Sequence, residues 1–177
     1  MFDLQINAEL YDKNIAKLLL SKKNFSSSND DAIVKDYFVR FAISDKQRKI
    51  LWKNCIGNKL KMNKEIFSNL MIKLGKEVFP DSIEKLIRYD MMRSFPKFNT
   101  QMSDDDDTFK NLTLLLKLFH IYRPEVGYTQ GMAYHMSLLY TYYSEYETFK
   151  YFCNLIYTKE FIFQFYKFNM KKVIFFI

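Results

Sequence analysis

The chain has 177 residues, of which 49% are hydrophobic and 18% aromatic, and its formal net charge is +7. This length and this apolar content supply enough material for a packed core, so the composition excludes a disordered chain. The basic residues are scattered along the sequence without forming a continuous cationic stripe, so we do not expect nucleic-acid binding.

Helical periodicity dominates the sequence. Only four Gly and three Pro interrupt it, and apolar residues recur at spacings of three and four, which is typical of amphipathic helices. We therefore expect an all-α fold. A first helix is predicted over about residues 4–20, and a polar, Ser-rich linker follows over residues 22–30. We place the domain boundary near this linker, with the N-terminal helix and linker in residues 1–30 and the main domain in residues 31–177.

Capping residues mark the next two helices. Ser44, with Gln47 three residues later, forms a capping-box pattern that predicts the start of a helix, and Gly57 predicts its end. Asn63 is expected to cap a second helix because its side chain can accept from free amides at the helix start. Gly75 is expected to end that helix, because glycine tolerates a positive φ.

Another helix is predicted to begin after Pro80-Asp81, with Glu84 as its capping partner. The acidic run of residues 104–107 stands directly before another apolar pattern, so its charges would meet the positive end of a helix dipole. We expect this capping role and not Ca²⁺ binding, because the run lacks a glycine and ligands spaced around a turn. Beyond a break at residues 123–127, we expect a helix over about 128–143 and apolar segments over about 147–157 and 160–170.

Metal sites and membrane spans find no support in the sequence. Cys55 and Cys153 lie far apart, and only His120 and His135 are available to complete a metal site, so we expect none and assign both histidines to helices. The first residues do not resemble a signal peptide, and no apolar run approaches the roughly 20 residues that span a bilayer. We therefore expect a cytoplasmic protein.

Two short segments carry the most specific pattern of the chain. The first has the form I-x-x-D-x-x-R, and the second has the form Y-x-Q inside a Gly-Tyr-x-Gln-Gly-Met string. Either pattern alone is weak, but both together, in this order and with a helical segment between them, are specific. The residues are Ile87, Asp90 and Arg93 in the first segment and Tyr128 and Gln130 in the second.

These motifs resemble the TBC domain, the catalytic domain of Rab GTPase-activating proteins. Arg48, four residues before Trp52, is similar to the opening motif of that family, and the resemblance covers roughly residues 40–170. It implies a multi-helix fold, of which this chain would hold the N-terminal lobe. It also implies a Rab-family small GTPase as partner and a role in vesicle trafficking. The partner would bring GTP and Mg²⁺, so no cofactor of the chain's own is expected.

The resemblance implies a role for each motif residue. Arg93 would be an arginine finger that stabilises charge on the transferring phosphoryl group, and Gln130 would be a glutamine finger that holds the attacking water. Asp90 would orient a guanidinium by a charge-assisted hydrogen bond. Tyr128 would hold the loop or contact the partner, and Ile87 would support the site by packing.

Each of these two residues, taken alone, also has an interpretation without a catalytic role. Arg93 would then be a solvated residue near a helix end, and Gln130 would be an early helix residue. Their joint occurrence favours the catalytic reading. The alternative is a catalytically incompetent Rab-binding or scaffold fragment from a truncated gene model, because the TBC domain normally continues through a second lobe and residues 173–177 leave five apolar side chains at the end of the chain. Membrane contact would be indirect, through the lipid-anchored GTPase on endomembranes.

Overall fold

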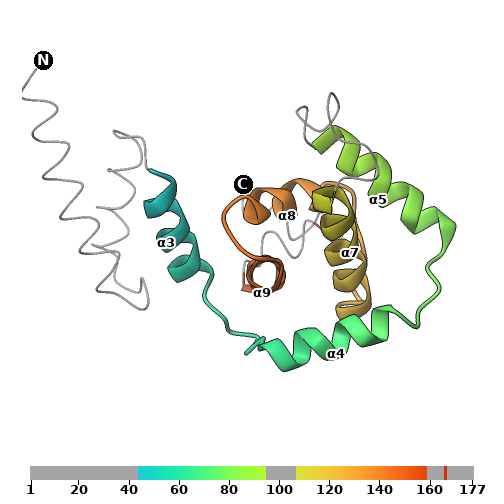
Figure 1. The fold of residues 1–177 in the computed structure, drawn as a ribbon, viewed down its shortest axis with the longest axis horizontal. Coiled ribbons are helices and arrows are strands. Elements are labelled where there is room, and N and C mark those ends of the chain that lie inside the picture. Colours follow the sequence, from blue (N-terminus) through green and yellow to red (C-terminus); the bar gives the residue numbers. More distant parts are fainter. Residues whose placement is uncertain (1–43, 95–106, 159–165, 167–177) are drawn as a thin grey trace, which may run out of the picture. The chain divides into compact units, whose positions relative to one another are not determined.

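The structure is a computed structural model that describes residues 44–94, 107–158 and 166. These residues form six α-helices and no strand, which confirms the predicted all-α class. Figure 1 shows their order along the chain. The helices are α3 (Asp45–Ile56), α4 (Lys64–Leu74), α5 (Asp81–Ser94), α7 (Asp107–Tyr122), α8 (Met132–Tyr140) and α9 (Glu145–Thr158).

Some of the predicted features lie outside the described residues. These are the helix over about 4–20, the linker over 22–30, positions 104–106 of the acidic run, the apolar segment over about 160–170 except Tyr166, and the apolar close at 173–177. The chain divides into two compact units, Met1–Gly57 and Asn58–Ile177. Helix α3 belongs to the first unit, and the other five helices belong to the second.

Helix α3 begins and ends where its capping residues predict. The Ser44 hydroxyl accepts from the Gln47 amide at 3.4 Å, and the Gln47 side chain accepts from the Ser44 amide at 2.8 Å. These two bonds complete the capping box and satisfy amides that a helix start leaves free. The helix stops at Gly57, which has φ +65°, and the Gly57 amide donates to the Lys53 carbonyl at 3.0 Å.

Helix α4 also begins as predicted, because Asn63 Oδ1 accepts from the Ile66 amide at 2.8 Å. Its last residue is Leu74, so the predicted stop is confirmed. The expected positive φ at Gly75 is wrong, since that residue has φ −63°. The chain instead leaves the helix through further right-handed turns, in which the amide of residue 76 donates to the carbonyl of residue 73 at 3.0 Å.

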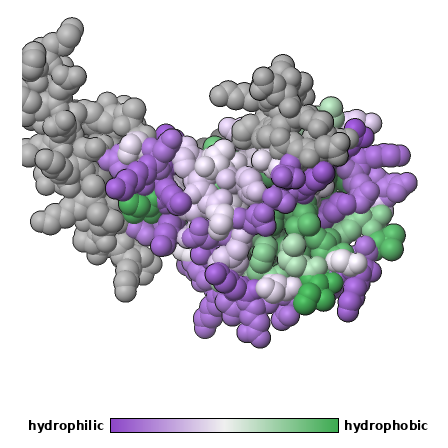
Figure 2. All heavy atoms as spheres, viewed as in Figure 1, coloured by the Kyte–Doolittle hydropathy of each residue, from purple (hydrophilic) through white to green (hydrophobic). Residues whose placement is uncertain are grey.

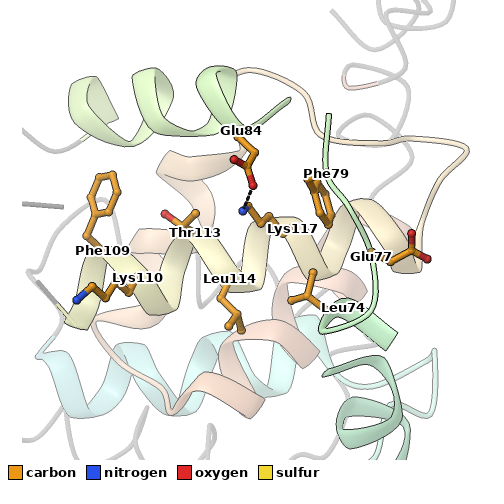
Figure 3. Close-up of a pocket in the computed structure, with 9 residues that line it drawn as sticks. All are labelled: Leu74, Glu77, Phe79, Glu84, Phe109, Lys110, Thr113, Leu114 and Lys117. Carbon is orange, nitrogen blue, oxygen red and sulfur yellow. Dashed lines mark hydrogen bonds and ion pairs between the residues drawn. The ribbon is translucent and has the colours of Figure 1, made fainter. Parts of the chain in front are cut away.

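Helix α5 starts at Asp81, directly after Pro80, and the Pro80 carbonyl accepts from the Ile83 and Glu84 amides at 2.9 and 3.2 Å. The prediction that the Glu84 side chain caps this helix is wrong. Figure 3 shows the reason: the Glu84 carboxylate points away from its own backbone and pairs with the ammonium group of Lys117 on α7. Glu84 therefore forms an ion pair between α5 and α7 and does not cap its own helix.

Helix α7 lies at the centre of the second unit. It contacts α4, α5, α8 and α9, and in Figure 1 it lies between α5 and α9. A helix covered by several neighbours must be apolar over much of its circumference, and burying each large apolar side chain contributes about 1.5–3 kcal/mol. Its six buried apolar side chains are Phe109, Leu112, Leu115, Leu116, Leu118 and Phe119.

The predicted helix over about residues 128–143 is wrong at both ends. Helix α8 runs only from Met132 to Tyr140. It cannot start earlier because Gly131, its N-cap residue, has φ +96°, a left-handed conformation that interrupts a right-handed helix. Residues 128–130 therefore lie in a turn before the helix. The next apolar segment falls within α9, as its periodicity indicates.

A hollow of about 430 Å³ lies between α4, α5 and α7. Figure 3 shows Thr113 and Leu114 pointing away from opposite sides of α7. Hydrophobic side chains also reach the surface near α4, where Ile72 and Val78 are exposed, and Figure 2 shows green patches among the hydrophilic surface on this face. The lining residues are Leu74, Glu77, Phe79, Glu84, Phe109, Lys110, Thr113, Leu114 and Lys117.

Candidate functional site

The last turn of α5 holds a buried acid beside an exposed base. Asp90 is 2% exposed, and its Oδ1 accepts from both Nε and Nη2 of Arg93 at 3.1 Å. The two residues are three positions apart, so one helical turn brings their side chains together. The Arg93 side chain remains 52% exposed. Because a guanidinium carries five donors, donors remain on Arg93 beyond those that Asp90 uses.

The second carboxylate oxygen of Asp90 reaches across to the loop before α8. Oδ2 accepts from the Tyr128 hydroxyl and, at 2.7 Å, from the Gly131 amide. Tyr128 is buried, and burial together with its hydrogen bond to the Asp90 carboxylate raises the pKa of its hydroxyl well above the usual value. Tyr128 therefore keeps its proton and remains a donor to Asp90. One carboxylate thus ties the end of α5 to the loop that follows α7.

The loop itself is folded by hydrogen bonds from its backbone amides. The amides of Val126 and Gly127 donate to the Arg123 carbonyl at 3.0 and 2.8 Å. Gly127 has φ +67°, a conformation that favours glycine, and it turns the chain toward α7. The next amide, that of Tyr128, donates to Nδ1 of His120 at 3.0 Å. The loop therefore closes back on the last turn of α7.

Gln130 lies on this loop between two anchored residues. The Tyr128 amide two positions earlier is held by His120, and the Gly131 amide one position later is held by Asp90. Gln130 itself is exposed, and within the described residues its side chain makes no hydrogen bond. It is not an early helix residue, because α8 begins only at Met132. Its backbone is fixed while its amide group faces solvent.

The structure joins three of the five predicted site residues by direct hydrogen bonds: Asp90, Arg93 and Tyr128. Gln130 joins them through its neighbour Gly131, and no hydrogen bond connects its side chain with Arg93. Ile87 is fully buried one turn before Asp90, so it anchors the inner face of α5 in the core. The upstream motif lies on α3, where the Arg48 guanidinium pairs with Asp45 at 2.8 Å and Trp52 is half-buried.

Sequence reasoning assigned no role at the site to His120, His135 and Tyr166, or to the backbone amide of Gly131. His120 and the Gly131 amide hold the loop. His135 and Tyr166 form a further pair, with the Tyr166 hydroxyl 2.7 Å from His135 Nδ1, and the Tyr166 carbonyl accepts from Thr129 Oγ1 at 3.3 Å. Both histidines do lie in helices as predicted, in α7 and α8. No spacing rule connects a side chain on one element with a backbone amide on another, so these bonds could not be predicted from the sequence.

The described residues contain no group of three or more His, Cys, Asp and Glu side chains that would hold a metal ion. Asp90 is unsuited to coordination because both its oxygens already accept hydrogen bonds from the protein. Burial raises the pKa of the Cys153 thiol well above its usual value, so this cysteine remains a neutral thiol in the core.

No helix in the described part of the chain has the length and apolar character needed to cross a bilayer. Chemically, the site offers an exposed guanidinium and an exposed amide side chain. One buried carboxylate binds the guanidinium directly and also holds the backbone amide next to the residue that carries the amide side chain. A guanidinium can stabilise negative charge on phosphate oxygens, and an amide can both donate to and accept from a water molecule.

Comparison with protein-family models identifies the family of this chain. The model described as the Rab-GTPase-TBC domain matches residues 45–177. The matched range contains all six described helices and both motif segments. Among curated protein sequences, none gives a significant match.

Proposed function

The chain belongs to the Rab-GTPase-TBC domain family, and from that premise we propose that Arg93 and Gln130 accelerate GTP hydrolysis on a Rab-family small GTPase in trans. Membership of the family implies Rab GTPase activation in general. The proposal for these two residues rests on one observation: buried Asp90 binds both the exposed Arg93 and the loop that carries the exposed Gln130. One carboxylate therefore holds the Arg93 side chain and also anchors the backbone next to Gln130.

Arg93 is proposed to act as the arginine finger. Phosphoryl transfer from GTP spreads negative charge over the phosphoryl oxygens, and an arginine finger that stabilises this charge raises the rate by about 10³–10⁵. Asp90 holds one edge of the Arg93 guanidinium, which limits the orientations that the side chain samples before it meets the nucleotide. A lysine at this position would lack the planar fork and would not restore activity.

Gln130 is proposed to hold the attacking water in place of the glutamine of the GTPase. Its amide can accept from the water and donate to a phosphate oxygen at the same time. The exposed position of Gln130, between the anchored amides of Tyr128 and Gly131, supports this role because a fixed backbone leaves little conformational entropy to lose on docking. In this scheme, the GTPase supplies GTP and Mg²⁺, and membrane contact is indirect.

Exposed apolar side chains next to both fingers support docking of a protein partner. Tyr89 and Met92, which precede Arg93 on α5, are 66% and 43% exposed, and Tyr134, four residues after Gln130, is 52% exposed. Aromatic, methionine and arginine side chains are enriched in the centres of protein interfaces. We assign Tyr89, Met92 and Tyr134 to the surface that contacts the GTPase around the nucleotide.

The test is a single-turnover GTP-hydrolysis assay over a panel of Rab proteins. The wild-type chain is expected to accelerate hydrolysis on at least one Rab. Arg93→Ala should remove about 10³-fold or more of that acceleration, and Arg93→Lys should not restore it. Gln130→Ala should also lower the rate at saturating Rab concentrations. Arg88→Ala is the matched control, because Arg88 is an exposed arginine on the same helix and should leave the saturated rate near wild type.

Two outcomes contradict this function. Acceleration that survives both Arg93→Ala and Gln130→Ala would rule out the two-finger mechanism. Binding of a Rab without any acceleration would instead support the alternative of a Rab-binding or scaffold fragment.

A further inference from the structure

We propose that His120 is a positioning residue that sets the place of Gln130 by holding the amide of Tyr128. This inference rests on the proposed function and adds a residue outside both motif segments. His120 belongs to the last turn of α7, eight residues before Tyr128. It reaches the site only because the loop of residues 123–131 turns back on that helix.

The hydrogen bond fixes both the protonation and the direction of the imidazole. Nδ1 accepts from the Tyr128 amide at 3.0 Å, so Nδ1 carries no proton and the ring proton of neutral His120 lies on Nε2. The Tyr128 amide belongs to a buried residue, and a buried amide without an acceptor would be unfavourable by about 1–3 kcal/mol. His120 is therefore the group that satisfies this amide.

A second contact restrains the imidazole from the other side. The Phe79 ring lies 5.6 Å from the His120 ring, centroid to centroid, at an interplanar angle of 57°. Lys117 Nζ lies 5.3 Å from the centroid of the Phe79 ring, and the same ammonium pairs with Glu84. Figure 3 shows Phe79 beside the Glu84–Lys117 pair. The phenyl ring that restrains His120 is thus itself packed against an ion pair between two helices.

The position of Gln130 depends on two acceptors of different kinds. On the C-terminal side, Asp90 holds the Gly131 amide, and on the N-terminal side, His120 holds the Tyr128 amide. Asp90 also holds Arg93, so its loss would disturb both fingers. His120 has no hydrogen bond to Arg93 or Asp90 among those found in the described residues, so its loss should act on the Gln130 loop alone.

Two substitutions at His120 separate the hydrogen bond from the bulk of the side chain. In His120→Asn, the amide oxygen stands the same number of bonds from Cα as Nδ1 does, so it can accept from the Tyr128 amide. In His120→Gln, the acceptor stands one bond further out, near the place of Nε2. We expect His120→Asn to keep the wild-type rate. We expect His120→Gln and His120→Leu to lower the rate at saturating Rab concentrations by about 10- to 100-fold, since small misplacements of reacting groups have effects of this size, with KM close to wild type.

A double-substitution cycle tests whether His120 acts through Gln130. In the Gln130→Ala background, His120→Leu should have no further effect on the saturated rate, because the group that it positions is already absent. Asn58→Leu is the matched control for a general loss of stability. Asn58 Oδ1 accepts from the Met62 amide at 2.9 Å in another loop, so this change also removes an acceptor from a backbone amide, but away from Gln130.

Amide hydrogen exchange of the chain without GTPase gives an independent readout. His120→Leu and His120→Gln should speed exchange of the Tyr128 amide, and His120→Asn should not. A wild-type chain that accelerates hydrolysis, combined with equal rates for the Asn and Gln variants, would overturn the role of His120 and leave the proposed function standing. A wild-type chain that accelerates no Rab would instead overturn the proposed function, whatever the exchange rates show.

Discussion

Replacing Asp90 by Asn should weaken the fold and the activity together, because one buried carboxylate serves both. The wild-type carboxylate accepts from Arg93 on Oδ1 and from Tyr128 and Gly131 on Oδ2. Asparagine keeps only one acceptor oxygen. If that oxygen faces the two buried donors, the new NH₂ group faces the Arg93 guanidinium and releases it. If the oxygen faces Arg93, the two buried donors lose their acceptor.

The first orientation is the less unfavourable one, and its effect can be estimated bond by bond. Hydrogen bonds to a charged group contribute about 1.5–3 kcal/mol each and neutral ones about 1 kcal/mol, so Tyr128 and Gly131 together lose about 1–4 kcal/mol. The Arg93 pair adds less than about 1 kcal/mol, because a half-exposed ion pair is screened by solvent. Asp90→Asn should therefore lower the free energy of unfolding by about 1–5 kcal/mol.

The measurement is urea unfolding followed by circular dichroism, beside the single-turnover GTPase assay. Arg93→Ala is the matched control, because it removes the same ion pair from the other end. The Arg93 side chain is 52% exposed, so water can take its place at Asp90 Oδ1, and the free energy of unfolding should fall by less than about 1 kcal/mol while acceleration is lost. An Asp90→Asn protein that unfolds at the wild-type urea concentration and retains full acceleration would refute the shared role of this carboxylate.

Two further predictions concern one buried tyrosine and two exposed ones. Burial raises the pKa of the Tyr151 hydroxyl to about 12, whereas an unfolded tyrosine ionises near about pH 10. Between these two pH values, unfolding therefore releases a proton. The stability from neutral Tyr151 is fully present below about pH 10 and is lost as the pH rises toward about 12. Urea midpoints at about pH 9 and pH 11 should show this loss, and Tyr151→Phe should make the decline shallower; a decline of the same slope in both proteins would count against the assignment. Substituting Ala for exposed Tyr89 or Tyr134 should raise KM for the Rab substrate and leave the saturated rate and the unfolding midpoint near wild type, and the idea fails if KM does not change in either variant.

Helix starts were predictable from the sequence wherever the cap is local. Ser44 and Asn63 each satisfy the amide three residues ahead in the chain, so the pattern of a few residues contains the whole interaction. Glu84 shows where this reasoning stops. Its spacing fits a cap, but the competing partner, Lys117, lies 33 residues away, and only the packing of α5 on α7 brings that ammonium group within reach.

The start of α8 was mispredicted for a related reason. The helix was expected to begin at about Tyr128, directly after the break at residues 123–127, but the amides of residues 128 and 131 are held by side chains from other elements. Asp90 of α5 and His120 of α7 take the amides of Gly131 and Tyr128, and the left-handed Gly131 makes the turn possible. Tertiary hydrogen bonds of this kind override local helix preference.

The motif letters were enough to pick out Arg93 and Gln130, but the way in which the fold holds them required the structure. Both side chains are exposed, so neither contributes much burial to stability. Asp90 binds the Arg93 side chain, and Asp90 and His120 hold the backbone on either side of Gln130. Substitutions at these two proposed fingers should therefore change activity with little change in stability. Substitutions at Asp90 and Tyr128 should change both, because each leaves a buried polar partner unsatisfied. His120 falls between these classes: its hydrogen bond supports the loop of Gln130 alone, so the Asn and Gln variants separate its effect on activity from its effect on stability.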